Sequence, residues 1–406
     1  MVALLLASSL AAGNTFVVDY FSSNPAADFE DLQLALDTVP DGSRLLVQNY
    51  FSNSGPHSEW LPFTVTKSVE LVGDIPGLSE FGTLATTLLI DAPGKTVLVE
   101  RLVLGGDYGA MEGDAVEVRS ARFVQFRTCT LRGGTHVEHG VDVYDAGLRV
   151  TGQVDIVSLI DCYANGFGTT TLGGNVTIDE GGTWVAPPVG GPGLVLPPDL
   201  VGLANLSACS VTGGMGAWIN YQCDPALDLD PPGPLVGGDG GPGLVGECYA
   251  SGSSIAGGEG GGLFGDDDWD GCIDDVACAG VICDGVGDTG VDVEGSVVDR
   301  ELSPPLLVAP WGATGQLSGR VQAPGLLVLA FVVADVSPPL LLRKIDGPLE
   351  VLPPWISITA VSDPISYFRI TADVPDDPLL LGLPVFAQVL SNSALSMVGA
   401  ALIFEE

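Results

Sequence analysis

The residues with the clearest chemical potential form an acidic loop in the second half of the chain. Carboxylates at alternate positions, Asp266, Asp268 and Asp270, precede a glycine, and Asp274 follows shortly after. Oxygen atoms at this spacing can surround one Ca²⁺, and the glycine allows the sharp turn that such a loop needs. The sequence therefore predicts a calcium site of structural role at these four residues. The alternative is an acidic loop that holds no metal.

This loop is similar to the DxDxDGxxD calcium loops of thrombospondin type 3 and dockerin modules. It departs from an EF-hand, in which the twelfth position carries a bidentate glutamate, because Ala277 stands there.

Two of the three histidines lie in one segment, 135–142, together with Glu138. His136 and His139 could hold a transition metal or act as a general acid–base pair with a neighbouring carboxylate. In an extended segment their odd spacing points them to opposite faces, which argues against a shared metal. Solvated loop histidines are the alternative.

Several arginines fall on or beside two successive repeats and form a candidate ligand-binding row. An exposed row of this kind can bind uronate or sulfate groups of an acidic polysaccharide. Alternatively, each arginine pairs with a nearby carboxylate such as Glu117 or Asp142. The residues are Arg119, Arg122, Arg127, Arg132 and Arg149.

The eight cysteines divide into two groups. Cys129, Cys162 and Cys209 occupy equivalent places in a repeat, which predicts a buried ladder of thiols. The other five lie in loops rich in Gly and Asp, where disulfides are expected in an oxidising compartment. No CxxC pair is present, which argues against zinc. The five are Cys223, Cys248, Cys272, Cys278 and Cys283.

The chain has a formal net charge of −37 and no Lys or Arg between Thr151 and Asp299. Such a surface repels nucleic acid and anionic membranes, so neither is an expected partner. Residues 1–13 combine an apolar stretch with small residues, which predicts a signal peptide and export. No apolar run reaches the length of a membrane-spanning helix.

One phrase recurs three times along the middle of the chain, at Phe123–Gly134, Val154–Gly166 and Leu203–Gly214. Each copy is a short strand with apolar residues at alternate positions, a cysteine near its end and a glycine turn. A unit this short cannot bury its own apolar face, so it must stack on its neighbours. The phrase predicts an all-β solenoid.

The elements before these repeats indicate how the solenoid begins. Asp28–Val39 has the apolar spacing of a helix, with Asp28 as its N-cap, and strands are expected at Arg44–Val47 and Phe63–Val72. This arrangement resembles the start of right-handed parallel β-helix proteins of the pectate-lyase-like superfamily. The resemblance implies a capping helix over the first rungs and a β-helix over residues 14–302.

After residue 302 the glycine phrases stop, and residues 303–406 are expected to form a small β-sandwich. The segment Val385–Ala394 resembles the closing strand of modules at the end of secreted bacterial β-helix proteins, particularly from planctomycete-like sources. The expected strands are Leu326–Ala334, Ile356–Val361, Tyr367–Ala372 and Pro384–Leu390.

No set of catalytic residues can be mapped onto the sequence, and fold alone does not confer activity. The sequence therefore favours an exported, non-catalytic surface protein that binds an extracellular polysaccharide or a cell-surface component. Two alternatives stay open: a polysaccharide-active enzyme (lyase, hydrolase or epimerase) that uses calcium, and a purely structural extracellular component. The sequence does not decide the oligomeric state.

Overall fold

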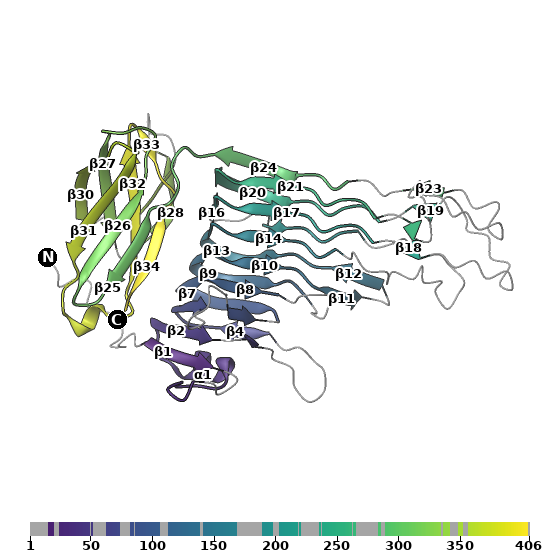
Figure 1. The fold of residues 1–406 in the computed structure, drawn as a ribbon, viewed down its shortest axis with the longest axis horizontal. Coiled ribbons are helices and arrows are strands. Elements are labelled where there is room, and N and C mark those ends of the chain that lie inside the picture. Colours follow the sequence, from purple (N-terminus) through teal and green to yellow (C-terminus); the bar gives the residue numbers. More distant parts are fainter. Residues whose placement is uncertain are drawn as a thin grey trace.

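The structure is a computed structural model (Figure 1). It describes residues 15–19, 24–48, 50–51, 62–73, 82–84, 86–105, 113–138, 141–168, 189–197, 203–217, 219–220, 235–236, 238–261, 263–264, 283–285, 289–333, 336–341, 348–351 and 356–404. The predicted signal peptide at 1–13 lies outside these residues.

The described chain is almost entirely β, and two parallel sheets make up its first three quarters. Eleven of the described strands form the first sheet and seven form the second. The first sheet contains β1 (Thr15–Asp19), β2 (Ser43–Gln48), β4 (Phe63–Val65), β5 (Val69–Gly73), β7 (Leu88–Glu100), β9 (Val116–Arg127), β13 (Leu148–Ile160), β15 (Leu194–Val195), β16 (Leu203–Ser207), β20 (Leu244–Ser251) and β24 (Val293–Asp299). The second contains β3 (Tyr50–Phe51), β6 (Gly82–Leu84), β8 (Leu102–Leu104), β10 (Thr130–Arg132), β14 (Tyr163–Asn165), β17 (Ser210–Thr212) and β21 (Ser254–Ala256).

Successive rungs stack in register, as expected for a solenoid. Val97, Val124 and Val157 are partners on the neighbouring strands β7, β9 and β13, and all three side chains are fully buried. The same inward row continues through Ala204 to Cys248 in later rungs. One continuous core therefore fills the space between the two sheets.

The corner between the sheets explains part of the recurring phrase. Arg101, Thr128, Asp161 and Ala208 each follow a strand of the first sheet and adopt the left-handed conformation, with φ of 52°, 51°, 53° and 52°. This conformation is unusual for residues other than glycine. Stacking hydrogen bonds hold it: the N–H of Thr128 donates to the carbonyl of Ile160 at 2.9 Å. The corner turns the chain, and the next residue then points into the core.

The glycines that close each phrase are not turns, contrary to the prediction. They begin segments that form two facing walls of the solenoid. Glycines from one wall and from the other alternate along a series of backbone hydrogen bonds. The N–H of Gly214 donates to Gly191 at 2.7 Å, that of Gly241 to Gly214 at 2.8 Å, and those of Gly258 and Gly290 continue the series at 2.8 Å. This glycine ladder, defined by these five residues, holds the walls together through backbone alone. Beyond it lie three small two-stranded pairings: β11 (Thr135–Glu138) with β12 (Val141–Tyr144), β18 (Ile219–Asn220) with β22 (Leu263–Phe264), and β19 (Leu235–Val236) with β23 (Cys283–Gly285).

A short helix, α1 (Leu32–Thr38), covers the N-terminal end of the solenoid and buries Leu32, Ala35 and Leu36. It begins later than predicted. The N-cap is Asp31, whose Oδ1 accepts from the N–H of Leu34 at 2.6 Å. Asp28, the predicted N-cap, instead accepts from the N–H of Val17 in β1.

The C-terminal unit is one mixed sheet that curls into a nearly closed barrel, whereas the sequence predicted a sandwich of two sheets. Its order is β30-β27-β32-β34-β25-β26-β31, and the end strands β30 and β31 approach each other. The four strands predicted here are confirmed within one residue at each end. The elements are β25 (Leu306–Pro310), β26 (Thr314–Arg320), β27 (Leu327–Val333), β30 (Ile356–Val361), β31 (Tyr367–Asp373), the 3-10 turn η2 (Pro378–Leu380), β32 (Pro384–Ser391), β33 (Ala394–Leu395) and β34 (Gly399–Phe404), with a separate hairpin of β28 (Val336–Leu341) and β29 (Pro348–Val351).

The barrel packs against the outer face of the first sheet (Figure 1). Leu98, Phe123 and Ile156, on three successive rungs, form an apolar cluster with Phe386 and other barrel residues. The rings of Phe123 and Phe386 meet edge to face, with centroids 5.1 Å apart. An apolar outer surface on a solenoid strand needs a cover, and the barrel supplies it.

Candidate functional site

A partly exposed polar surface lies along the first halves of β7, β9 and β13, and we call it the polar facet. Its side chains come from three successive rungs, so a rigid parallel sheet fixes their spacing. The facet consists of Asp91, Asp114, Glu117, Arg119, Ser120, Arg149 and Thr151.

Hydrogen bonds within the facet join side chains of the same rung and of neighbouring rungs. Arg119 donates from Nε to Oε1 of Glu117 at 2.9 Å and from Nη2 to Oε2 at 3.1 Å. The Thr151 hydroxyl donates to the same Glu117 carboxylate at 3.2 Å. The Ser120 hydroxyl donates to Asp91 on the preceding rung at 2.5 Å. These side chains are therefore held in place by one another.

Arg149 is the more enclosed of the two facet arginines. Its Nε donates to Oδ2 of Asp114 at 2.6 Å, while Oδ1 of Asp114 accepts from the N–H of Ala146. Burial acts to lower the pKa of Arg149, but the hydrogen bond and charge of Asp114 outweigh it and raise the pKa. The hydrogen bond that Arg119 donates to Glu117 likewise raises the pKa of this exposed arginine. Both guanidinium groups stay charged and paired.

The facet offers donors and acceptors with nearly balanced charge. Two arginines face three carboxylates, Asp91, Asp114 and Glu117. Of the two interpretations of the arginine row, pairing with carboxylates is confirmed for Arg119, which contacts the expected Glu117. Arg149 pairs with Asp114 instead. A balanced surface suits neutral groups that both donate and accept hydrogen bonds, such as sugar hydroxyls, better than uronates or sulfates.

The other predicted arginines lie elsewhere. Arg132 is on the second sheet, in β10, and Arg122 lies between Ala121 and Phe123 at the bend of β9. Arg127, at the end of β9, faces the barrel. The predicted row is therefore split among three surfaces, because strands on different sheets of a solenoid face different directions.

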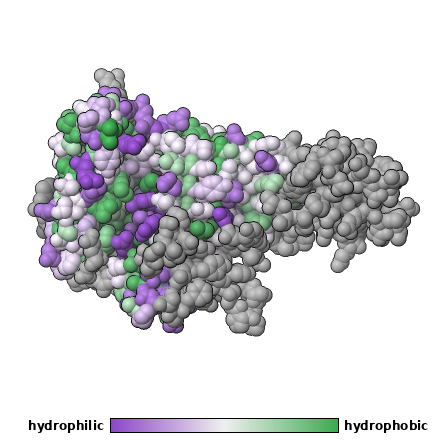
Figure 2. Space-filling model, viewed as in Figure 1, coloured by the Kyte–Doolittle hydropathy of each residue, from purple (hydrophilic) through white to green (hydrophobic). Residues whose placement is uncertain are grey.

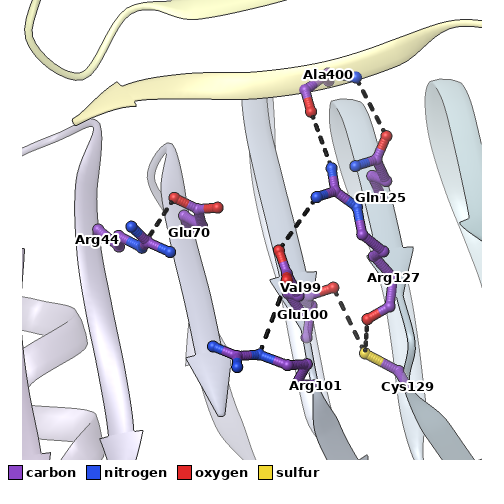
Figure 3. Close-up of polar contacts among 9 residues, drawn as sticks. All are labelled: Arg44, Glu70, Val99, Glu100, Arg101, Gln125, Arg127, Cys129 and Ala400. Carbon is purple, nitrogen blue, oxygen red and sulfur yellow. Dashed lines mark hydrogen bonds and ion pairs between the residues drawn. The ribbon is translucent and has the colours of Figure 1, made fainter. Parts of the chain in front are cut away.

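Arg127 belongs to an ionic cluster at the edge of the barrel contact (Figure 3). Its Nη1 lies 3.3 Å from Oε2 of Glu100, and its Nη2 donates to the carbonyl of Ala400 at 3.4 Å. Ala400 in turn donates its N–H to Oε1 of Gln125 at 3.3 Å. Figure 3 shows these side chains reaching from adjacent strands towards the crossing barrel strand β34. The cluster serves the contact between the two units rather than an open site.

Glu70 lies in the same cluster, 3.4 Å from Nε of Arg44, and is buried. The pKa of Glu70 is raised, and burial is the largest cause. Arg44 acts against this effect, Glu100 adds to it, and Arg127 and Arg101 oppose it more weakly. Since the folded-state pKa exceeds the unfolded one, the contribution of Glu70 to stability is complete below the ordinary glutamate pKa. That contribution is lost as the pH rises through the raised value.

Glu70→Gln keeps the shape of the side chain and removes its titration. The free energy of unfolding of the variant, minus that of the wild type, is expected to rise as the pH increases from the ordinary glutamate pKa through the raised one. Urea denaturation of both proteins across this range measures the difference. A difference that stays flat or falls with pH would contradict the assignment.

The cysteines behave partly as predicted. Cys129, Cys162 and Cys209 are buried free thiols at equivalent positions, and the N–H of Cys129 donates to Sγ of Cys162 at 3.5 Å. Burial raises the pKa of Cys162, and the hydrogen bond with Cys162 raises that of Cys209. These three thiols form the predicted ladder.

The prediction that Cys248 forms a disulfide is wrong. It is a buried free thiol in the inward row of Val157 and Ala204, and burial raises its pKa to about 12. Neutral buried thiols act as small apolar groups. Cys223, Cys272 and Cys278 lie outside the described residues, and for Cys283 the structure describes the backbone of β23 alone.

Of the remaining predicted site residues, the structure describes only His136. His136 lies in strand β11, opposite Val143 of β12, and not in the solvated loop that was the alternative interpretation. His139 and the calcium residues Asp266, Asp268, Asp270 and Asp274 lie outside the described residues. Within the described part of the chain, no group of three or more His, Cys, Asp or Glu side chains has an arrangement suited to a metal ion.

Sequence reasoning missed four members of the facet, Asp91, Asp114, Ser120 and Thr151. Their partners lie about one rung away in the sequence, and the register that joins them depends on loops of unequal length. The equivalence of Asp114-Ala-Val-Glu-Val and Gly147-Leu-Arg-Val as rung openings was the available signal, since it aligns Glu117 with Arg149.

Among the residues that the structure places, none forms a helix with the length and apolarity to cross a membrane. No protein-family model matches the chain, and no curated protein matches it either.

Proposed function

We propose that this chain is an exported, non-catalytic surface protein that binds extracellular glycan through the polar facet. The observation that carries the proposal is the facet itself: paired arginine and carboxylate side chains, fixed across three rungs and partly exposed. We further propose that the fold is a right-handed parallel β-helix of the pectate-lyase-like kind. The in-register parallel rungs and the N-terminal helix support that fold.

The geometry favours a neutral polysaccharide over an acidic one. Each facet arginine already has a carboxylate partner, so an anionic sugar would have to displace Glu117 or Asp114. A neutral sugar can add hydrogen bonds to the existing pairs without separating them. Export, from the predicted signal peptide, and a structural calcium ion at Asp266, Asp268, Asp270 and Asp274 belong to the same proposal.

The test is retention of the full chain on neutral and acidic polysaccharides, with calcium and with chelator. Arg119→Ala and Glu117→Gln are each expected to weaken retention about tenfold or more, because each removes a charge-assisted hydrogen bond. Arg132→Ala is the matched control, since it removes an arginine of the second sheet. It is expected to leave retention unchanged.

The other outcomes discriminate among the alternatives. Release of new chain ends would replace the binding function with the enzymatic one. Tighter retention on uronate polysaccharides than on neutral ones would contradict the role of the balanced facet. Equal retention of the wild type, Arg119→Ala and Arg132→Ala would place binding away from the facet. If no polysaccharide retains the protein, the glycan-binding function is wrong and a purely structural extracellular role becomes the favoured alternative.

A further inference from the structure

A helix covers the N-terminal end of the solenoid, whereas no described strand or helix covers the other end. At the N-terminal end α1 packs on the first rungs and buries its apolar face. At the other end the last rung consists of β24 in the first sheet, and β21 is the last strand of the second. Among the described strands, none pairs with the outer edge of either.

The apolar row of the core is only half covered at this end. Leu244 and Cys248 are buried in the rung before, at 0% and 3% exposure. Their partners in β24, Val293 and Val297, point the same way but are only partly buried. Val298, on the outward face of β24, is 49% exposed. Inward valines that lack a covering rung are apolar surface available to a partner.

The backbone of β24 also has a free edge. The N–H of Leu244 donates to the carbonyl of Asp292, and the N–H of Arg300 donates to the carbonyl of Ala250. Because hydrogen-bonding direction alternates along a parallel strand, even-numbered residues of β24 face β20 and odd-numbered ones face outwards. The N–H groups of Val293 and Val297 therefore lie on the open edge, which is a template for an added strand.

The charge around this edge is acidic. Asp292, Glu294 and Asp299 flank or lie in β24, and Glu247 is exposed on the neighbouring strand. Arg300, the next cation along the chain, is buried and donates to the carbonyls of Leu395 and Ser396 at 3.0 and 2.8 Å. A second copy of this chain would bring like charges together, which disfavours pairing of two such ends.

We infer that the open end of the solenoid binds an extended segment of a partner protein in which apolar and basic residues alternate. The segment pairs with the free edge of β24. The apolar side chains of the segment cover Val293 and Val297. Its lysines or arginines lie on the opposite face of the added strand, next to Glu294. This is strand addition, in which the backbone supplies affinity and alternate side chains supply selectivity.

The test uses the full chain and a labelled, end-blocked peptide of alternating valine and lysine, with fluorescence anisotropy as the readout. Saturable binding is expected for this peptide. Loss of binding is expected for the same peptide with glutamate in place of lysine. Glu294→Lys is expected to weaken binding of the lysine peptide at least fivefold, because it replaces attraction by repulsion.

Two variants at one position separate the backbone edge from the side chain. Val297→Pro removes a donor of the open edge and leaves the pairing with β20 intact. It is expected to abolish binding, whereas Val297→Ala keeps the donor and is expected to retain most of it. Circular dichroism verifies that both variants are folded, and Glu294→Lys provides the test if Val297→Pro does not fold.

Equal binding to Val297→Pro and the wild type would overturn the inference, as would the absence of saturable binding. Dimers that form without peptide and disappear in Val297→Pro would assign the edge to a second copy instead. Glycan retention by the polar facet is expected to be unchanged in all three variants, so failure of one proposal is distinguishable from failure of the other.

Discussion

Replacing Gly214 with alanine is expected to lower the free energy of unfolding by about 3 kcal/mol. A Cβ atom at this position would lie 1.8 Å from the carbonyl oxygen of Phe167 and 2.3 Å from its carbonyl carbon. The backbone of Phe167 is itself fixed, since its N–H donates to Asp145 and its carbonyl accepts from Gly191. Neither wall can move aside without breaking the glycine ladder. The midpoint of urea denaturation measures the loss.

Gly252→Ala is the matched control for this experiment. Gly252 occupies the same corner between the two sheets as Ala208, with φ of 60° against 52°. A Cβ atom at Gly252 meets nothing within 4 Å. Only the modest cost of a left-handed alanine is expected, about 1 kcal/mol. If Gly214→Ala costs no more than Gly252→Ala, close approach of the walls is not what selects glycine in the ladder.

Phe386→Ala is expected to destabilise the contact between the barrel and the solenoid by about 3 to 5 kcal/mol. Phe386 is fully buried and lies edge to face with Phe123 of the solenoid. Its removal leaves a cavity at the centre of the apolar cluster that joins the two units. The expected signs are a lower denaturation midpoint for the barrel and faster proteolysis of the connecting segment 300–305.

A double-mutant cycle assigns the effect to the contact. Phe123→Ala and Phe386→Ala are expected to be non-additive by about 1 kcal/mol, because each removes the same ring pair. Ile365→Ala is the control within the barrel: its side chain is 76% exposed, so a change below about 0.5 kcal/mol is expected. Full additivity of the two phenylalanine substitutions would show that the rings do not stabilise each other.

The barrel contact also determines which parts of the solenoid surface are accessible. It covers the outer face of the first sheet from Leu98 to Ile156 and occupies Arg127. The polar facet, on the first halves of the same strands, stays partly exposed. Hydrophilic and hydrophobic residues intermingle over the described surface of barrel and solenoid in the view of Figure 2. The two surfaces that we propose for binding are the facet and the open end near β24.

The sequence by itself determined the solenoid and much of its core. Alternating apolar residues in the three phrases predicted parallel rungs, and the equivalent cysteines predicted the buried ladder of Cys129, Cys162 and Cys209. Both follow from local periodicity, because the residue that faces the core in one rung faces it in the next. Four strands of the C-terminal unit were also predicted, from dense apolar residues between Pro and Asp turns.

Only the tertiary structure decided which residues meet across rungs and between units. The arginine row was divided because Arg119, Arg127 and Arg132 belong to surfaces that face different directions. Cys248 joined the core because the register of β20 with β16 places it below Ala204. The outward-facing Phe123 is buried because the distant Phe386 and other barrel residues cover it. Such contacts depend on rung register and on docking, and loops of unequal length hide both from any pattern along the chain.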